Sequence, residues 1–410
     1  MKFLFSLAWK NLFRYRRRTL ITAGTLAAGI AVFIWLDGWL LGAQKESERN
    51  VVWYEAGSAK VLHRQYLEEV RNLSLKNLLE DPAAVERALA GSGAAFTRRI
   101  DFAGELFFGE GSLYVKVIAV DPRADERVFR LSETIVQGSR LQEGEPGVIL
   151  GEWLAEDLGA AVGDSVSILA RTRLGSFQTI DLVVTGILNC PNPVVNKGTA
   201  FIPLSLAGES LEMGGAVSEL ALYFPEWQSP QARTEELRSR LSGFPELVVV
   251  GWRELARDYL MIARSKSAAT SLLLFLIFII AAVGISNTML MAVYERVREI
   301  GMMRALGMPD ASIRLAFLLE AGGIGLIGSV VGLALGIMID WYMVRRGLDF
   351  SALIGRMDIG YRVHGVFRSA WHPQAFAGGL AFGVLAPIVI AFIPSSRAFK
   401  MQITACLRYE

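Results

Sequence analysis

Residues that carry covalent or metal chemistry are sparse in this 410-residue sequence. The three histidines, His63, His364 and His372, lack the H-E-x-x-H spacing of a zinc hydrolase. Cys190 and Cys406 are too few for a disulfide framework or a Cys/His metal cluster. No Ser/His/Asp or paired-carboxylate pattern stands out, and there is no G-x-x-x-x-G-K-[ST] run to bind ATP. The sequence therefore predicts a chain that is not an enzyme and binds no cofactor of its own.

The stretch from Tyr294 to Gly307 instead has the pattern of a short amphipathic helix, with charges between its apolar residues. This stretch reads YERVREIGMMRALG, and its apolar residues recur at helical spacing. They are Val293, Val297, Ile300, Met303 and Leu306. Gly307 predicts the end of the helix, and Asp310 is expected to cap the next one. By pattern alone, the stretch could equally be a solvated turn that only sets topology.

Two apolar runs flank this charged stretch, at residues 267–293 and 315–340. Each is as long as the roughly 20 residues that a bilayer-spanning helix needs. The stretch must then lie in water at one membrane face, and its arginines favour the cytoplasmic side. These arginines are Arg296, Arg298, Arg304 and Arg314.

Overall composition agrees with a membrane protein that carries a large aqueous domain. The chain is 52% hydrophobic, its mean hydropathy is +0.38, and the apolar residues are concentrated in a few runs. The net charge of +2 is too small to indicate binding of nucleic acid, and no basic tail with interleaved aromatics is present.

The charged stretch and the residues that follow it resemble the signature of FtsX-like permeases. The string ERVREIGMMRALG leads into IRLAFLLEA, and the match is long and nearly uninterrupted. The resemblance implies that the stretch couples the permease to a dimer of cytoplasmic ABC ATPase subunits, which bind the ATP and magnesium. The residues expected to make this coupling are Glu295, Arg296, Arg298, Glu299, Ile300, Gly301, Met303, Arg304, Ala305, Leu306 and Gly307.

Both ends of the chain extend the resemblance. Residues 1–18 read as a basic amphipathic helix at the membrane surface, and WKNLFR within them resembles the family's N-terminal elbow. A first span is expected at 19–42; a signal peptide is the alternative, but the apolar run is long and lacks a clear cleavage site. Asp37 near its far end is interpreted as a residue that reaches the interface. In the tail, Gln402-Ile403 replaces the family's Asp-Pro, and Cys406 is an extra residue.

Residues 43–266 predict an α+β domain. Strands are expected at residues 112–120, 164–170, 179–188, 199–203 and 219–224. Asp81-Pro82 and Ser229-Pro230 each predict the start of a helix. Because both ends return to the bilayer, 43–130 and 226–266 should form a membrane-proximal lobe, with an inserted β-lobe at about 131–225. The extracytoplasmic domains of MacB-type and lipoprotein-releasing permeases have this layout, as the resemblance implies.

The segment 189–198, NCPNPVVNKG, predicts a turn or loop tip. It is either a plain hairpin turn or a protruding contact for a partner. In lipoprotein-releasing permeases a loop of this lobe recruits the soluble carrier, although no motif here fixes the correspondence. The residues of such a contact would be Asn192, Pro193, Asn196 and Lys197.

The remaining spans have features that bear on helix packing. A single long helix is expected from Arg253 to Val293, because this region lacks proline and its first glycine is Gly284. In the third span, Gly328, Gly332 and Gly336 recur every four residues on one face, which permits close helix contact. That contact is either within the chain or with a second permease subunit. The loop 341–374 is rich in arginine, which fits the positive-inside rule poorly for an outer loop.

Taken together, the sequence predicts four transmembrane helices with a large α+β extracytoplasmic domain between the first and the second. The expected order is elbow 1–18, span 19–42, domain 43–266, span 267–293, coupling segment 294–314, span 315–340, outer loop 341–374, span 375–394 and cytoplasmic tail 395–410. The resemblance implies a permease of the cell inner membrane with both termini in the cytoplasm.

By the same resemblance, this permease would transmit the motion of separate ATPase subunits outward, and its layout is nearest to that of lipoprotein-releasing permeases. The expected partners are the ATPase dimer, a second identical or homologous permease, lipoprotein cargo and a periplasmic carrier. The alternatives are a regulator of cell-wall hydrolases, an exporter of another amphipathic substrate and a membrane-anchored enzyme.

Overall fold

The computed structural model describes residues 2–14, 16–69, 72–226, 229–257, 294–349 and 366–398, with scattered positions between 259 and 291. The chain separates into two units, which we describe in turn. A helical unit contains the described residues of 2–45, 294–349 and 366–398. A sheet unit contains those of 46–257.

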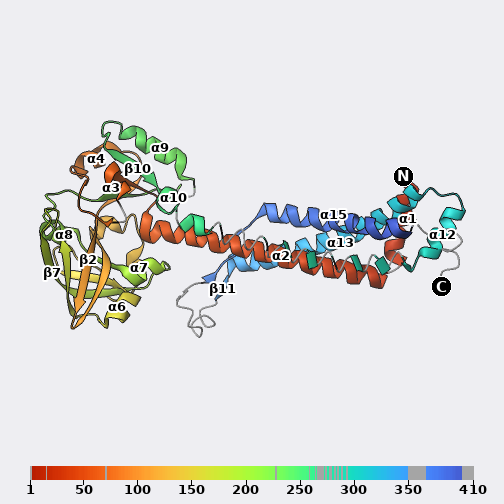
Figure 1. Ribbon diagram of the computed structural model, residues 1–410, viewed down its shortest axis with the longest axis horizontal. Helices are drawn as coiled ribbons and strands as arrows, with labels where there is room; N and C mark the ends of the chain where they lie inside the picture. Colours follow the sequence, from red (N-terminus) through yellow and green to blue (C-terminus); the bar gives the residue numbers. More distant parts are fainter. Residues whose placement is uncertain are drawn as a thin grey trace. The chain divides into compact units, whose positions relative to one another are not determined.

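In the helical unit, helices that are far apart in sequence lie side by side (Figure 1). Its elements are α1 (Lys2–Arg14), α2 (Arg16–Val51), α12 (Val297–Ala305), α13 (Asp310–Arg345), β11 (Leu348–Asp349), β12 (Val366–Phe367) and α15 (Pro373–Ala398). Among the described residues, three helices are long and apolar enough to span a membrane, and they are Thr19–Ala56, Asp310–Arg345 and Pro373–Phe392.

These three helices correspond to the first, third and fourth expected spans, and each is longer than its apolar run. The expected second span, 267–293, lies largely outside the described residues. The long helix expected from Arg253 begins as α10 (Trp252–Leu255), and Ala256 then caps it with φ −89° and ψ 22°. The prediction of one uninterrupted helix from Arg253 was therefore wrong at Ala256.

The sheet unit is built from ten strands and several short helices. Its elements are η1 (Val52–Ala56), β1 (Ala59–His63), α3 (Arg64–Glu68), α4 (Pro82–Leu89), β2 (Ala95–Phe108), β3 (Gly111–Val120), α5 (Pro122–Asp125), η3 (Leu131–Thr134), β4 (Ile135–Gly138), β5 (Gly147–Gly151), α6 (Glu152–Leu158), β6 (Ser165–Arg171), β7 (Phe177–Leu188), α7 (Pro193–Gly198), β8 (Thr199–Pro203), α8 (Leu204–Ser210), β9 (Glu219–Tyr223), α9 (Pro230–Arg240), β10 (Leu247–Gly251) and α10.

Six of these strands close into a barrel. The pairings run β2–β3–β8–β5–β7–β6, and β6 returns to β2. Strand β2 pairs with different strands along its length. Residues 95–99 pair with β9, and residues 104–107 pair with β6. Gly104 begins the β6 pairing, and a Cβ there would lie 2.7 Å from Ile168 Cγ2. Only glycine fits this crossing without a shift of its neighbours.

The order β10–β1–β9–β2 continues the sheet beyond the barrel. Strands β2 and β3 belong to the barrel although they lie before residue 131, the expected start of the inserted lobe. Strand β9 lies inside the expected lobe, before residue 225, but it pairs with β1 and β2 outside the barrel. The sheet is thus continuous across both limits that the sequence suggested for an inserted lobe.

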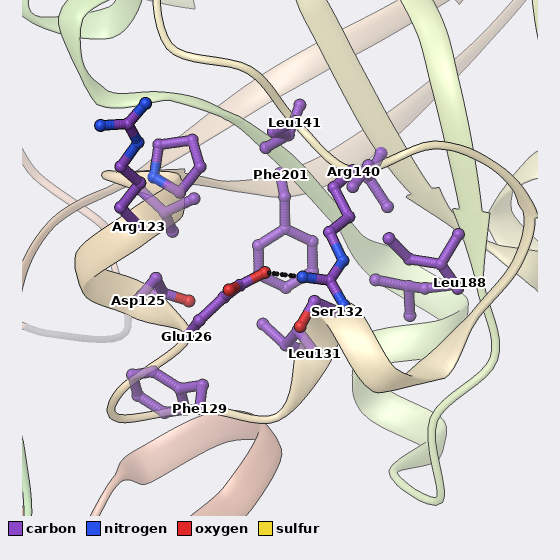
Figure 2. Close-up of a pocket in the computed structure, with 14 residues that line it drawn as sticks. Arg123, Asp125, Glu126, Phe129, Leu131, Ser132, Arg140, Leu141, Leu188 and Phe201 are labelled. Atoms are coloured by element: carbon purple, nitrogen blue, oxygen red, sulfur yellow. Dashed lines mark hydrogen bonds and ion pairs between the residues drawn. The ribbon is translucent and has the colours of Figure 1, made fainter.

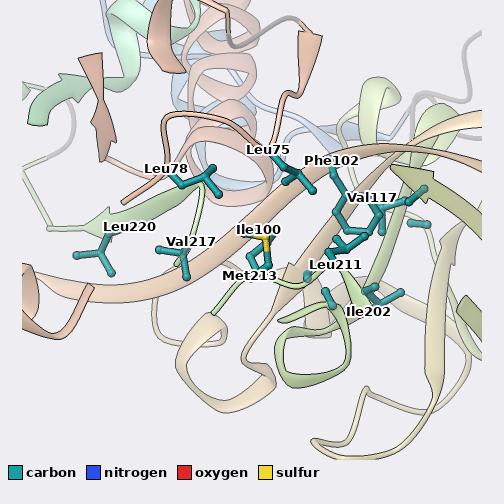
Figure 3. Close-up of a cluster of buried hydrophobic side chains, with 14 of the residues drawn as sticks. Leu75, Leu78, Ile100, Phe102, Val117, Ile202, Leu211, Met213, Val217 and Leu220 are labelled. Carbon is teal, nitrogen blue, oxygen red and sulfur yellow. The ribbon is translucent and has the colours of Figure 1, made fainter. Parts of the chain in front are cut away.

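One main core fills the barrel and extends under α4 and α9. Figure 3 shows part of it, with Phe102 and Val117 from neighbouring strands close to Ile202, and Ile100 beside Met213. Successive strand residues point to opposite faces, so the neighbours of these residues face away from this core. Ile118 and Val120 accordingly belong to a second apolar cluster outside the barrel.

The face of β2 that points away from the main core also carries buried charges. The Arg99 guanidinium is fully buried and forms two hydrogen bonds of 2.8 Å with the Asp125 carboxylate. Lys60 pairs with Glu219 at 2.7 Å, and Lys116 pairs with Asp101 at 2.6 Å. Burial disfavours ionised Asp101, but Lys116, Lys60 and Arg99 outweigh it and lower the pKa of this carboxyl. These cations therefore favour the ionised form of Asp101, whereas burial and the nearby Asp101 charge raise the pKa of Glu219.

The five expected strands are confirmed as β3, β6, β7, β8 and β9, each within a residue or two of its expected limits. Helix α4 starts at Pro82 with the Asp81 side chain accepting from the Ala84 amide, and α9 starts at Pro230. Both helix predictions are confirmed.

We expect Asp125→Asn to destabilise the sheet unit by about 3–5 kcal/mol, because the buried Arg99 loses its charge partner. Glu126→Gln is the matched control. It removes a neighbouring carboxylate whose ion pair with Arg140 is exposed, and should cost under about 1 kcal/mol. Pulse proteolysis of the full chain in urea measures both changes. Equal losses would contradict the assignment of Arg99–Asp125 as the dominant pair.

Candidate functional site

The charged stretch forms the short helix α12, and its apolar side packs on the start of α13. Val297 and Ile300 are buried, with Ile313 in the same cluster, and Met303 packs against it. The predicted helix is confirmed, and so are Val297, Ile300 and Met303 of its apolar face, whereas Val293 lies outside the described residues. Leu306 does not join that face, since it is 88% exposed. The helix ends at Ala305, so the helical spacing no longer applies at residue 306.

The turn between α12 and α13 depends on Gly307, whose φ of +86° favours glycine. The predicted helix end is therefore confirmed. Asp310, however, is the first residue of α13, and the N-cap is Pro309. Instead of capping the helix, the Asp310 carboxylate forms an ion pair with Arg304 at 3.0 Å. This ion pair links the end of α12 to the start of α13.

Behind α12 lies a buried ion pair. Arg296 donates to the Glu320 carboxylate of α13 at 2.7 Å, with side chains only 3% and 5% exposed. The Asn11 amide of α1 donates to the same carboxylate at 3.4 Å. Arg14, also in α1, lies 3.7 Å from Glu299. Three segments that are distant in sequence therefore meet here, and we call this set the α1–α12–α13 junction.

The predicted coupling residues fall into three groups by burial. Glu299, Met303 and Arg304 are half-buried, and Glu295 and Gly307 are exposed beyond the ends of α12. Arg296, Ile300 and Gly301 are buried and hold α12 in place. Within the described part of the chain, the opposite side is open to solvent. This outer face of α12 consists of Arg298, Met302 and Ala305 together with Leu306, the residue directly after the helix. Sequence reasoning omitted Met302, although its spacing from Arg298 and Ala305 places it opposite the buried residues.

The glycine face of α13 lies against α2. A Cβ on Gly328 would lie 2.8 Å from the Ala23 carbonyl oxygen, one on Gly332 2.7 Å from that of Ala27, and one on Gly336 2.9 Å from Ile34 Cβ. On another side of α13, a Cβ on Gly325 would lie 2.5 Å from the Gly383 carbonyl of α15. The glycines thus allow α2, α13 and α15 to pack backbone to backbone.

The far end of the helical unit is joined by polar contacts. Ser369 donates to the buried carboxylate of Asp340 at 2.6 Å, and the Ala370 amide donates to the Gly38 carbonyl at 2.9 Å. Asp37, near the far end of the first span, pairs with His372.

Residues 193–198 form the short helix α7 where sequence predicted a turn or loop tip. Pro193 is its first residue, and the Asn192 side chain accepts from the Val194 amide. Asn192 and Asn196 are buried, and the Asn196 side chain bonds the backbone of Cys190 in both directions. The loop prediction was wrong because asparagine here caps and braces a helix. Of the four residues suggested for a partner contact, only Pro193 and Lys197 are exposed.

The Cys190 thiol in this segment is not activated as a nucleophile. Burial raises the pKa of the Cys190 thiol to about 11, so the thiol stays protonated at neutral pH. No group of three or more metal-binding side chains is gathered in the described residues. The described site therefore offers ionic and apolar contact surfaces.

We expect Gly332→Ala to weaken the contact between α2 and α13 by about 1–3 kcal/mol, because the added methyl overlaps the Ala27 backbone. Gly378→Ala is the control, since nothing lies within 4 Å of its Cβ position, and it should change stability by less than about 0.5 kcal/mol. Unfolding of the full chain by SDS titration measures both. Equal stability of the two variants would contradict close packing at Gly332.

Glu320→Leu should cost about 3–5 kcal/mol, because it leaves the Arg296 guanidinium buried without this carboxylate. The double variant Arg296→Met/Glu320→Leu should recover most of that loss, since neither charge then remains buried. The same SDS titration tests the pair. A double variant as unstable as Glu320→Leu would show that the two side chains do not act together.

Two family models match the chain. Residues 19–240, more than half of it, match the MacB-like periplasmic core domain, and residues 271–403 match the C-terminal region of FtsX-like permeases. The outer face of α12 and the α12 and α13 residues of the junction lie within the second match, whereas Asn11 and Arg14 of α1 precede both matches.

Curated relatives match either along most of their length or along a part of it. The lipoprotein-releasing system transmembrane protein LolC of Neisseria meningitidis serogroup B is 26% identical over 72% of this chain and 73% of its own. The corresponding protein LolE of Haemophilus influenzae is 26% identical over 70% and 71%. The macrolide export ATP-binding/permease protein MacB of Nitrobacter winogradskyi is 27% identical over 63% of this chain and 38% of its own. The chain therefore belongs to the FtsX-like family of ABC transporter permeases that carry a MacB-like periplasmic core domain.

Proposed function

We propose that this permease transmits ATP-driven motion of separate ATPase subunits to its extracytoplasmic domain, and that this motion extracts lipoproteins from the inner membrane for a carrier. The observation that carries the proposal is the α1–α12–α13 junction. It fixes α12 to two other helices while its outer face stays exposed. A force applied to Met302 or Leu306 would therefore move α1 and α13 as well.

The second step of the proposal is the route outward. Helix α2 continues without a break from Arg16 to Val51, which is about 54 Å at 1.5 Å per residue. The glycine face of α13 packs on its first half. In the sheet unit, its last turn and η1 contact the 189–198 segment: Asn50 donates to the Pro191 carbonyl at 3.3 Å, and Asn192 donates to Glu55 at 2.9 Å. Movement of α2 would thus reach the exposed side of α7.

Lipoproteins are the proposed cargo because the LolC and LolE relatives match along comparable shares of both chains. The MacB relative is matched over only 38% of its length. ATP and magnesium would be bound by the partner subunits, as expected for a chain without a P-loop sequence.

The cargo is tested by cross-linking the full chain in cells and identifying the proteins that co-purify. Triacylated lipoproteins, a soluble carrier and an ABC ATPase support the proposal. Recovery of a peptidoglycan hydrolase in their place would support a regulator of cell-wall hydrolysis and overturn the cargo assignment.

Contact with the ATPase is tested by a photo-cross-linking residue at Met302 or Leu306. Both positions should cross-link to the ATPase subunit, whereas the buried position Ile313 should not. Failure at both exposed positions would contradict the docking role of the outer face.

Arg304→Glu should uncouple ATP hydrolysis from lipoprotein release, because it replaces the attraction to Asp310 with repulsion at the end of α12. We expect release to fall about tenfold or more, while membrane insertion and hydrolysis persist. The charge-swapped variant Arg304→Glu/Asp310→Arg should recover release. Reconstituted complexes provide both rates, and normal release by Arg304→Glu would count against coupling through α12.

A further inference from the structure

A cavity opens on the outside of the barrel in the sheet unit, and its floor residues belong to the apolar cluster that also contains Val195 of α7. The cavity has a volume of about 140 Å³. Its floor comes from the outward-facing residues of barrel strands, and its walls come from α5, η3 and the loop after β4. The cavity exists because short helices only partly cover this face of the barrel.

The interior of the cavity is apolar. Phe201 of β8, Ile149 of β5 and Leu188 of β7 form its floor, and Phe129 and Leu131 lie at its side (Figure 2). An apolar cavity of about 150 Å³ lined by such side chains is large enough to bind benzene. The interior therefore fits one six-membered ring or a short alkyl group.

The mouth of the cavity is charged. Figure 2 shows the Arg140 guanidinium reaching across to Glu126, at 2.7 Å, in front of the Phe201 ring. Both side chains are largely exposed, so opening this ion pair costs at most about 1 kcal/mol by comparison with similar pairs. Asp125, the other carboxylate at the cavity, is held by Arg99 through two hydrogen bonds.

A second guanidinium lines the same cavity. Arg123 of α5 is exposed and has no ion-pair partner among the residues that the structure describes. Arg140 faces the apolar cavity, and Arg123 lies at its rim with a guanidinium that points away from Phe201 (Figure 2). Of the two carboxylates at the cavity, Asp125 is already paired with Arg99. This balance favours an anionic ligand over a cationic one.

We propose that this cavity binds a small amphiphile, in which a ring or short alkyl group enters the cavity and an attached carboxylate or phosphate binds Arg123 and Arg140. Binding would exchange the Glu126–Arg140 pair for a pair with the ligand. The site is separate from the coupling surface and does not rest on the proposed function.

The test measures binding of 4-phenylbutyrate to the full chain in lipid nanodiscs by saturation-transfer NMR, with empty nanodiscs as background. 4-Phenylbutylammonium has the same apolar group with the opposite charge, and we expect it to bind at least tenfold more weakly. 4-Phenylbutyl phosphate distinguishes the source of the anion. Tighter binding of the phosphate indicates a phospholipid-type head group, and tighter binding of the carboxylate indicates a fatty-acid type.

Two kinds of variant test the site itself. Arg123→Ala and Arg140→Ala should each weaken binding of the butyrate about tenfold, as expected for loss of a charge-assisted contact. Arg127→Ala is the control, since this nearby exposed arginine does not line the cavity, and it should bind normally. Ile135→Phe, which enlarges a lining residue at an edge strand, should abolish binding.

Unchanged binding in Ile135→Phe would place the ligand elsewhere and overturn the proposal. Equal affinity for the ammonium compound would overturn the anionic character of the site. Absence of butyrate and phosphate binding to the wild-type chain would also overturn it, and would leave the cavity as a seat for a partner's side chain.

Discussion

The buried pair between Arg296 and Glu320 is the interaction on which the helical unit depends. Both charges lie almost fully out of water, so each is tolerable only while the other is in place. The pair joins the residue before α12 to the first third of α13, and Asn11 extends it to α1. A short helix of nine residues could not hold its position by its own hydrogen bonds. The junction supplies the missing rigidity and leaves the opposite face of α12 open.

The glycine contacts extend this rigidity into the transmembrane helices. Carbonyl oxygens of α2 and α15 approach α13 at positions where any side chain would collide. Such close packing resists sliding, because small shifts bring backbone atoms into overlap. In the sheet unit, the guanidinium carbons of Arg49 and Arg130 lie 4.7 Å and 4.0 Å from the ring centre of Trp53 in η1. The last turn of α2, which contains Arg49, is therefore held by contacts within the sheet unit.

Much of this arrangement could be predicted from the sequence, because hydrophobic length and helical spacing are local signals. They located three spans, α12 and five strands. Contacts between residues far apart in the sequence could not be predicted in this way. The pairing of Asp37 with His372 joins residues 335 positions apart, and the sequence around either residue does not indicate it. Asn192 and Asn196 look like loop residues by composition, but their side chains brace a helix.

The longest strand, β2, escaped prediction for a related reason. Its pattern mixes buried charges with apolar residues, since Arg99 and Asp101 lie on the face opposite the main core and are buried there against partners on neighbouring elements. Local alternation cannot show that a charge will be paired. Likewise, the role of Glu320 within its apolar helix follows from Arg296, which lies 24 residues earlier.

The central claim, that work on a cytoplasmic surface is felt by a folded domain on the other side of the membrane, is tested most directly by labelling. Arg298→Cys and Lys197→Cys, in a background with Cys406→Ser, place single reactive thiols on exposed residues of α12 and α7. A membrane-impermeant maleimide applied to intact spheroplasts should label Lys197→Cys at once and Arg298→Cys only after permeabilisation. Labelling of both positions from the same side would contradict the account.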